Sequence, residues 1–135
     1  AMICRFYNVY EPHEPKEGDY ATVVRKFIRQ YKNNEALTIV GDGSQRRDFT
    51  HVNDICDGLI KVMDNGLSNS LYHLGRGVNY SINELSLMFK DVEIKHVPER
   101  RGEGDVTLAD YQSTFDKLGW EAKNNLQDWI TNNTK

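Results

Sequence analysis

Cysteine is scarce in this chain, and the two cysteines that occur form no recognisable motif. Cys4 and Cys56 lie far apart, each beside apolar residues, without the C-x-x-C spacing of redox and metal sites. This pattern favours two reduced thiols in the core over a disulfide. Nor is a metal site expected, because the histidines show no H-x-H or H-x-x-x-H spacing; they are His13, His51, His73 and His96.

Long hydrophobic runs are also missing, which excludes a membrane-spanning helix. No apolar segment follows the N-terminus, so a secretory signal peptide is not expected and the sequence is typical of a cytoplasmic protein. Ala1 before Met2 is interpreted as a remnant of cloning. A net charge of −3 over 135 residues argues against general nucleic-acid binding, which depends on an excess of Lys and Arg.

The basic residues nevertheless include two adjacent pairs, Arg46–Arg47 and Arg100–Arg101. Pairs of this kind are most often solvated surface charges. Alternatively, their guanidinium groups bind an anion or, less in keeping with the net charge, nucleic acid.

The sequence lacks several common catalytic and cofactor-binding motifs. It contains neither G-x-x-x-x-G-K-[ST] nor G-x-G-x-x-G, so neither a Walker loop nor a dinucleotide site is indicated. There is no G-x-S-x-G nucleophile motif and no Tyr-x-x-x-Lys pair that could supply a phenolate base. No catalytic residue is therefore assigned, and the chain carries binding groups without reaction groups.

The chain does contain a regular series of short strand and helix patterns. β-Branched, aromatic or alternating segments predict strands at 3–10, 36–40, 47–52, 70–75 and 92–97. Apolar residues at helical spacing predict five helices, whose capping residues are Asp19, Asn53, Ser81, Asp110 and Asn125. We therefore expect an α+β fold with short strands, in one domain with one core.

The segment GDGSQR, residues 41–46, is predicted to be the tight connection of a hairpin between the strands on either side. Its glycines supply the positive φ angles that such a turn needs. Arg47 would leave this loop with a planar guanidinium suited to the paired oxygens of a phosphate, while Asp48 would serve the loop backbone. A second loop, PERRGEG, presents Arg100, and two converging arginines would neutralise a diphosphate.

Five motifs in order extend this interpretation. RFYNVYEP at 5–12 resembles the pattern R-x-F-N-V-Y-G-P, and the segment from Gly41 onward resembles G-D-G-S-Q-x-R-D-F-x-x-V-D-D. LYHLGRGVNYSINEL at 71–85 resembles Y-N-x-G-x-G…S-I-x-E-L, PERRGEG resembles P-x-R-P-G-D/E, and LAD with LGW completes the match. From about residue 3 to its end, the chain thus resembles the C-terminal half of extended short-chain dehydrogenases/reductases, the NAD-dependent nucleotide-sugar epimerase/dehydratase family that includes UDP-glucose 4-epimerase.

This resemblance implies that the chain binds a nucleotide-sugar, either a UDP- or a GDP-sugar. Arg47 would hold the diphosphate, Arg100 would meet it from the second loop, and Asn8 would contact the sugar–diphosphate region. The two-arginine hypothesis therefore gains a specific ligand.

The resemblance implies weaker roles for four further residues. Thr38 and Val40 would lie along the nucleobase or its ribose. Phe49 would line the pocket, and Glu103 would accept a hydrogen bond from a ribose hydroxyl. On the sequence alone, packing roles explain these residues equally well.

Three departures from the family pattern affect the loops that choose the substrate. Glu11 replaces a glycine, His13 stands where an arginine is common, and His73 replaces an asparagine.

The resemblance also implies that residues 3–135 form a C-terminal substrate-binding domain. The family's N-terminal Rossmann domain, with its NAD-binding glycines and catalytic Tyr-x-x-x-Lys, would precede residue 3. NAD is therefore expected in the whole parent enzyme and not on this chain alone. The strand at 3–10, left without its neighbours, is expected to bind the missing half or a second copy. Alternatively, the chain is a non-catalytic, stand-alone binding or interaction module.

Overall fold

The computed structural model describes residues 1–11, 22–98 and 106–135. These ranges contain five helices: α1 (Val23–Lys32), α2 (Val52–Asn65), α3 (Ile82–Ser86), α4 (Tyr111–Leu118) and α5 (Leu126–Asn133). They also contain eight short strands: β1 (Ile3–Phe6), β2 (Val9–Tyr10), β3 (Leu37–Val40), β4 (Arg46–Arg47), β5 (Thr50–His51), β6 (Leu71–Leu74), β7 (Tyr80–Ser81) and β8 (Ile94–Val97). The expected α+β class is confirmed. No described helix combines the length and the apolar character needed to span a bilayer.

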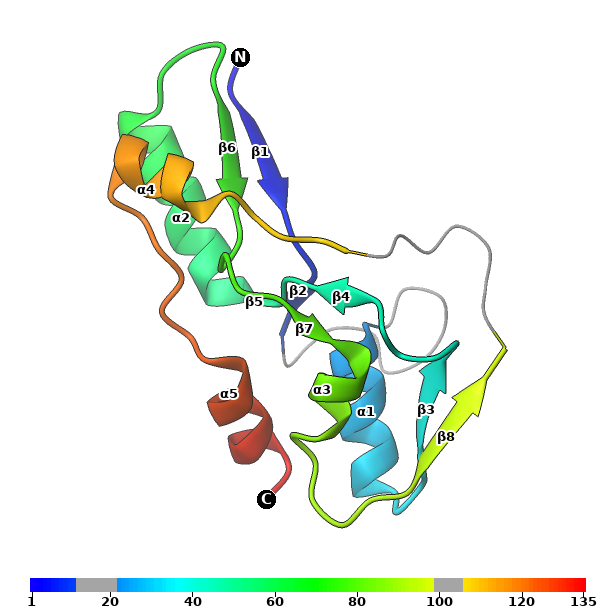
Figure 1. Cartoon of the computed structure of the whole chain (residues 1–135). Coiled ribbons are helices and arrows are strands. Elements are labelled where there is room, and N and C mark those ends of the chain that lie inside the picture. The colour runs from blue at the N-terminus through cyan, green and yellow to red at the C-terminus, as the bar shows by residue number, and fades with distance from the viewer. Residues whose placement is uncertain (12–21, 99–105) are drawn as a thin grey trace.

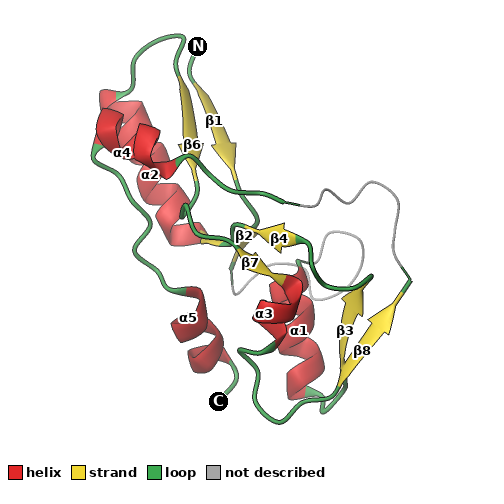
Figure 2. Cartoon of the chain, in the orientation of Figure 1, coloured by secondary structure: helices red, strands yellow, loops and turns green. Residues whose placement is uncertain are grey.

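The described strands form four separate two-stranded sheets (Figures 1 and 2). β1 pairs with β6, β2 with β5 and β3 with β8, all in parallel, whereas β4 and β7 are antiparallel. Figure 1 shows β1 and β6 with α2 and α4 at one end of the molecule, and β3 and β8 with α1 and α3 at the other. The short strands β2, β4, β5 and β7 lie between these two ends.

The prediction of one continuous strand over 3–10 is wrong. β1 ends at Phe6, and β2 begins at Val9. The chain changes partner between them, from β6 to β5, so that each half pairs with a different part of the molecule. The predicted strand at 47–52 is likewise divided, into β4 and β5.

The predicted hairpin around residues 41–46 is also wrong, because β3 pairs with β8 and β4 pairs with β7. The turn does have the expected backbone, since Gly41 and Gly43 have φ angles of 69° and 78°. A Cβ on Gly43 would lie 2.1 Å from Oδ1 of Asn83, at the start of α3. Gly43 is therefore required for both its φ angle and the close approach of α3.

Most of the capping predictions are confirmed. Ser81, Asp110 and Asn125 each accept a hydrogen bond from the backbone N–H three residues later, at the start of α3, α4 and α5. For α2 the prediction of Asn53 is wrong: the cap is His51, whose Nδ1 accepts from the Asn53 N–H at 3.0 Å. Thr22 caps α1, and the predicted cap Asp19 lies outside the described residues.

Two apolar clusters hold these elements together. The larger one joins α1, β3, α3 and α5; its buried members are Tyr10, Val24, Phe27, Ile28, Leu37, Ile39, Phe49, Ile82, Leu85, Phe89, Leu126 and Ile130. The smaller one, under α2, consists of Ile55, Leu74 and Trp120. Both cysteines are free thiols, but Cys56 lies exposed on α2, so the expectation of a core position is wrong for it.

A buried carboxylate, Asp48, joins three segments in the middle of the molecule. Its Oδ1 accepts hydrogen bonds from the Thr50 hydroxyl and the Arg76 N–H, both at 3.1 Å. Its Oδ2 accepts from the N–H groups of Gly77 at 2.9 Å and Ala109 at 3.0 Å. Asp48 is 0% exposed, so these four donors replace the water that the charge has lost. The prediction that Asp48 serves the backbone of the loop before it is therefore wrong, because its backbone donors lie in two distant segments.

We predict that Asp48→Asn destabilises the chain by about 3 kcal/mol. The neutral amide has only one acceptor oxygen, and its NH₂ group would face N–H donors that the carboxylate now satisfies. Urea unfolding monitored by circular dichroism measures this loss. The matched control is Asp57→Asn, because Asp57 is exposed on α2. A loss no larger than that of the control would contradict the role assigned to Asp48.

We also predict that the His51 cap makes stability depend on pH. Burial lowers the pKa of His51 from its ordinary value of 6.5, although the carboxylates of Asp54 and Glu11 act in the opposite direction. The fold therefore favours neutral His51, whose Nδ1 can accept the Asn53 N–H. This stability is present above pH 6.5 and is lost as the pH falls through the lower folded-state pKa.

The measurement compares the free energy of unfolding of the wild type and His51→Asn across this pH range. Asparagine caps helices without titrating, so the advantage of the wild type should shrink as the pH falls. A difference that stays constant with pH would show that the His51 cap does not titrate.

Candidate functional site

Asn8 and the β4–β5 segment are brought together through Thr107. The Asp48 N–H donates to Oγ1 of Thr107 at 3.1 Å, and this hydroxyl donates to Oδ1 of Asn8 at 3.0 Å. The Asn8 carbonyl also accepts from the Thr50 N–H at 3.3 Å. Asn8 is exposed and Arg47 directly precedes Asp48, so these hydrogen bonds link one predicted binding residue to the segment that carries another.

Arg47 lies at the end of β4 and is partly exposed. Its Nη1 donates to the Arg46 carbonyl at 2.8 Å, and its backbone pairs with Tyr80 of β7. The guanidinium therefore stays close to β4. A planar cationic fork in this position is chemically suited to a phosphate oxygen pair.

Three other predicted residues make contacts inside the protein. The Thr38 hydroxyl accepts from Nε2 of Gln30 in α1 at 2.9 Å. The Val40 carbonyl accepts from Nε2 of Gln45 at 3.1 Å. Phe49 is 2% exposed and belongs to the larger core cluster. None of these contacts joins them to the hydrogen bonds around Asn8 and Arg47.

The predicted residues Arg100 and Glu103, and the departure at His13, lie outside the described residues. The chain that follows is attached to β4. Val106 forms a parallel bridge with Arg46, and the Thr107 N–H donates to the Arg46 carbonyl at 2.9 Å.

Sequence reasoning missed a contact between His73, one of the three departures named above, and Tyr7, a further replacement that it did not note. Tyr7 stands at the phenylalanine of R-x-F-N, and His73 stands at the asparagine of Y-N-x-G. The Tyr7 hydroxyl lies 2.8 Å from Nδ1 of His73. Comparison of the two motifs reveals each replacement, but only the parallel pairing of β1 and β6 brings them side by side.

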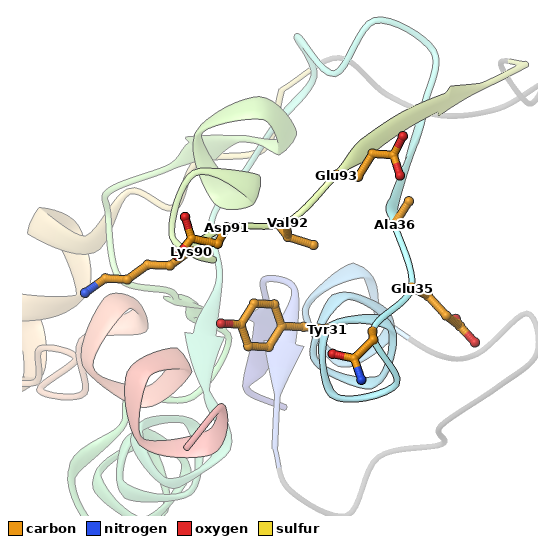
Figure 3. Close-up of a pocket in the computed structure, with 8 residues that line it drawn as sticks. Tyr31, Glu35, Ala36, Lys90, Asp91, Val92 and Glu93 are labelled. Carbon is orange, nitrogen blue, oxygen red and sulfur yellow. The ribbon is translucent and has the colours of Figure 1, made fainter.

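A cavity of about 330 Å³ lies at the N-terminal ends of β3 and β8 (Figure 3). Its lining comes from the end of α1 and the segment before β8; the residues are Tyr31, Asn34, Glu35, Ala36, Lys90, Asp91, Val92 and Glu93. In Figure 3 the side chains of Lys90 and Glu35 extend away from one another. The charged groups do not converge, and no predicted binding residue takes part. No group of three potential metal ligands occurs among the described residues.

Relatives of known name match this chain over most of its length. UDP-glucuronic acid decarboxylase 3 of Arabidopsis thaliana is 32% identical over 133 residues, which cover 95% of this chain and 38% of the relative. UDP-glucose 4-epimerase of Bacillus subtilis is 37% identical over 108 residues, which cover 70% of this chain and 32% of the relative. The chain thus spans about a third of the length of these relatives.

Solved structures share the fold. The crystal structure of UDP-glucose 4-epimerase with UDP-glucose from Thermotoga maritima has a TM-score of 0.91 and 30% identity, and the match covers 98% of this chain and 44% of that one. UDP-N-acetylglucosamine 4-epimerase from Methanobrevibacter ruminantium, in complex with UDP-N-acetylmuramic acid, has a TM-score of 0.88 and 28% identity, with 98% and 44% covered.

The family match agrees with both comparisons and with the motifs. Residues 1–75, more than half of the chain, match the family described as NAD dependent epimerase/dehydratase. The resemblance inferred from the sequence is thereby confirmed. This chain belongs to the NAD-dependent epimerase/dehydratase family.

Proposed function

We propose that residues 3–135 form the C-terminal, nucleotide-sugar-binding part of an NAD-dependent sugar-nucleotide epimerase or dehydratase. The observation that carries this proposal is the path of hydrogen bonds from Asn8 through Thr107 to Asp48, the residue after Arg47. This path links the exposed Asn8 to the segment that carries the Arg47 guanidinium. The names of the relatives make a UDP-sugar the first ligand to test.

In this proposal the residues orient the substrate. Arg47 pairs with the diphosphate oxygens, and the NH₂ group of Asn8 donates to the sugar–diphosphate region. Arg100 and Glu103, in the segment outside the described residues, would complete the grip on the diphosphate and the ribose. Holding the diphosphate fixes the sugar relative to the reacting groups, which is the contribution of binding to catalysis.

The cofactor would be held by another part of the whole protein. The chain has no G-x-G-x-x-G motif, because its three G-x-G sequences, which begin at Gly41, Gly75 and Gly102, all lack the third glycine of that fingerprint. The residues present therefore do not fit a dinucleotide site. NAD in the parent enzyme would supply hydride chemistry, and this chain supplies the substrate grip.

The β1–β6 sheet supports the proposal that further strands complete the molecule. The outer edge of β6 is closed, because the Thr114 hydroxyl accepts the His73 N–H at 3.1 Å and donates to the His73 carbonyl at 2.7 Å. Among the described residues β1 has no second strand partner, and its Ile3 and Phe6 are 60% and 50% exposed. Parallel sheets are normally covered on both faces, so β1 is where the remaining strands, or a second copy, would join.

We predict that Arg47→Gln weakens UDP-glucose binding by about tenfold to a hundredfold. Hydrogen bonds to charged groups contribute about 1.5–3 kcal/mol, and glutamine cannot replace the charged fork. Titration calorimetry measures the Kd, with uridine as the ligand that lacks phosphate. The control is Arg29→Gln, because Arg29 lies on α1 and forms an ion pair with Glu35 at 3.7 Å. Absence of UDP-glucose binding by folded wild type at millimolar concentration would refute the proposed function.

We also predict that the chain self-associates through β1 at micromolar concentration. Phe6→Glu should raise the dissociation constant about tenfold or more, because an apolar side chain buried at the contact becomes charged. Analytical ultracentrifugation measures this change. Leu87→Glu is the matched control, since Leu87 is 81% exposed at the end of α3, far from β1 in the fold. A wild type that stays monomeric throughout this range would contradict the prediction.

A further inference from the structure

Arg46 and Arg47 are neighbours in β4, yet their guanidinium groups are used differently. Arg46 donates from Nε to Oδ1 of Asn79 at 3.0 Å and from Nη2 to the Asn79 carbonyl at 3.1 Å. Its Nη1 donates to Oε1 of Glu84 at 2.5 Å. This hydrogen bond holds the pKa of Glu84 below its usual range, so the carboxylate remains charged. We call Arg46, Asn79 and Glu84 the Arg46 clamp.

The Arg46 clamp is connected to Thr107 in a closed ring. Nδ2 of Asn79 donates to the Thr107 carbonyl at 3.2 Å, and the Thr107 N–H donates to the Arg46 carbonyl at 2.9 Å. The hydroxyl of Thr107 in turn contacts Asn8 and the Asp48 N–H. A displacement of the Arg46 side chain would therefore reach Asn8 through two residues.

Arg47 depends on the same backbone. Its Nη1 donates to the Arg46 carbonyl at 2.8 Å, the oxygen that also accepts the Thr107 N–H. The two groups assigned to substrate binding are thus both connected to the Arg46 carbonyl, the Arg47 guanidinium directly and the Asn8 amide through Thr107. Glu84 has no hydrogen bond to either group among the described residues, although its carboxylate accepts the hydrogen bond that holds Arg46 from α3.

We infer that the Arg46 clamp positions Asn8 and Arg47 for the diphosphate of a nucleotide-sugar. This inference rests on the proposed function and extends it to residues outside the binding surface. We assign Arg46 as a positioning residue, because three of its five N–H groups, one on each nitrogen, already donate to Asn79 and Glu84.

The shape of the guanidinium is essential to this role. Its three nitrogens lie in one plane and reach a side-chain amide, a backbone carbonyl and a carboxylate at the same time. A lysine keeps the charge, but its single ammonium cannot reproduce that planar arrangement. Charge and geometry can therefore be separated by substitution.

The test measures the Kd of UDP-glucose for the full chain carrying Arg46→Lys or Glu84→Ala. Loss of positioning should weaken binding by about threefold to tenfold in both variants. If Arg46 instead contacted the phosphates directly, Arg46→Lys would also weaken binding, because a single ammonium cannot replace a bidentate guanidinium. Glu84→Ala would then bind more tightly, because it frees a cation and removes a nearby negative charge. Tighter binding by Glu84→Ala, or wild-type binding by Arg46→Lys, would overturn the inference.

Glu35→Ala is the matched control, since it removes the same charge and breaks another surface ion pair, to Arg29. It should leave the Kd unchanged. A readout without ligand separates this inference from the proposed function: nuclear magnetic resonance relaxation of the Arg47 Nε–H in the free chain. Its order parameter should fall in Arg46→Lys and Glu84→Ala but not in Glu35→Ala. An unchanged order parameter in both clamp variants would overturn the inference even if the wild type bound no UDP-glucose.

Discussion

The burial of one carboxylate, that of Asp48, is the constraint on which the candidate site depends. A buried charge is tolerated only when hydrogen-bond donors surround it. Asp48 receives them from three separate stretches of chain, around residues 50, 76–77 and 109. Because Arg47 immediately precedes Asp48 in the chain, the donors that hold this carboxylate also restrict the position of the Arg47 backbone.

The sheets of this chain are small for parallel sheets. Each of the three parallel sheets in the described part has only two strands. Parallel sheets usually have more strands, with helices on both faces. The match to Thermotoga maritima UDP-glucose 4-epimerase covers nearly all of this chain but less than half of that protein. The open edge and exposed apolar residues of β1 are in keeping with a proposed continuation of the sheet beyond this chain.

Features governed by neighbouring residues could be predicted well. The caps Ser81, Asp110 and Asn125 were identifiable because a capping side chain reaches a backbone N–H only three residues away. The positive φ angles of Gly41 and Gly43 follow from glycine itself. Family motifs also identified the chain's relatives, because those motifs are contiguous runs of residues. The helix caps, the backbone of the glycine turn and the family could thus be predicted from the amino-acid sequence.

The strand partners, and the different roles of Arg46 and Arg47, could not be predicted from the sequence. β1 meets β6 about 68 residues later, and Arg46 meets Glu84 38 residues later, so neither contact leaves a local pattern. The predicted hairpin was wrong because β8, more than 50 residues away, competes for β3. Arg46 and Arg47 are chemically identical, and their different partners follow from which segments pack on either side of β4. Residue chemistry acts locally, whereas pairing depends on which distant surfaces bury one another, and that is settled when the chain packs as a whole.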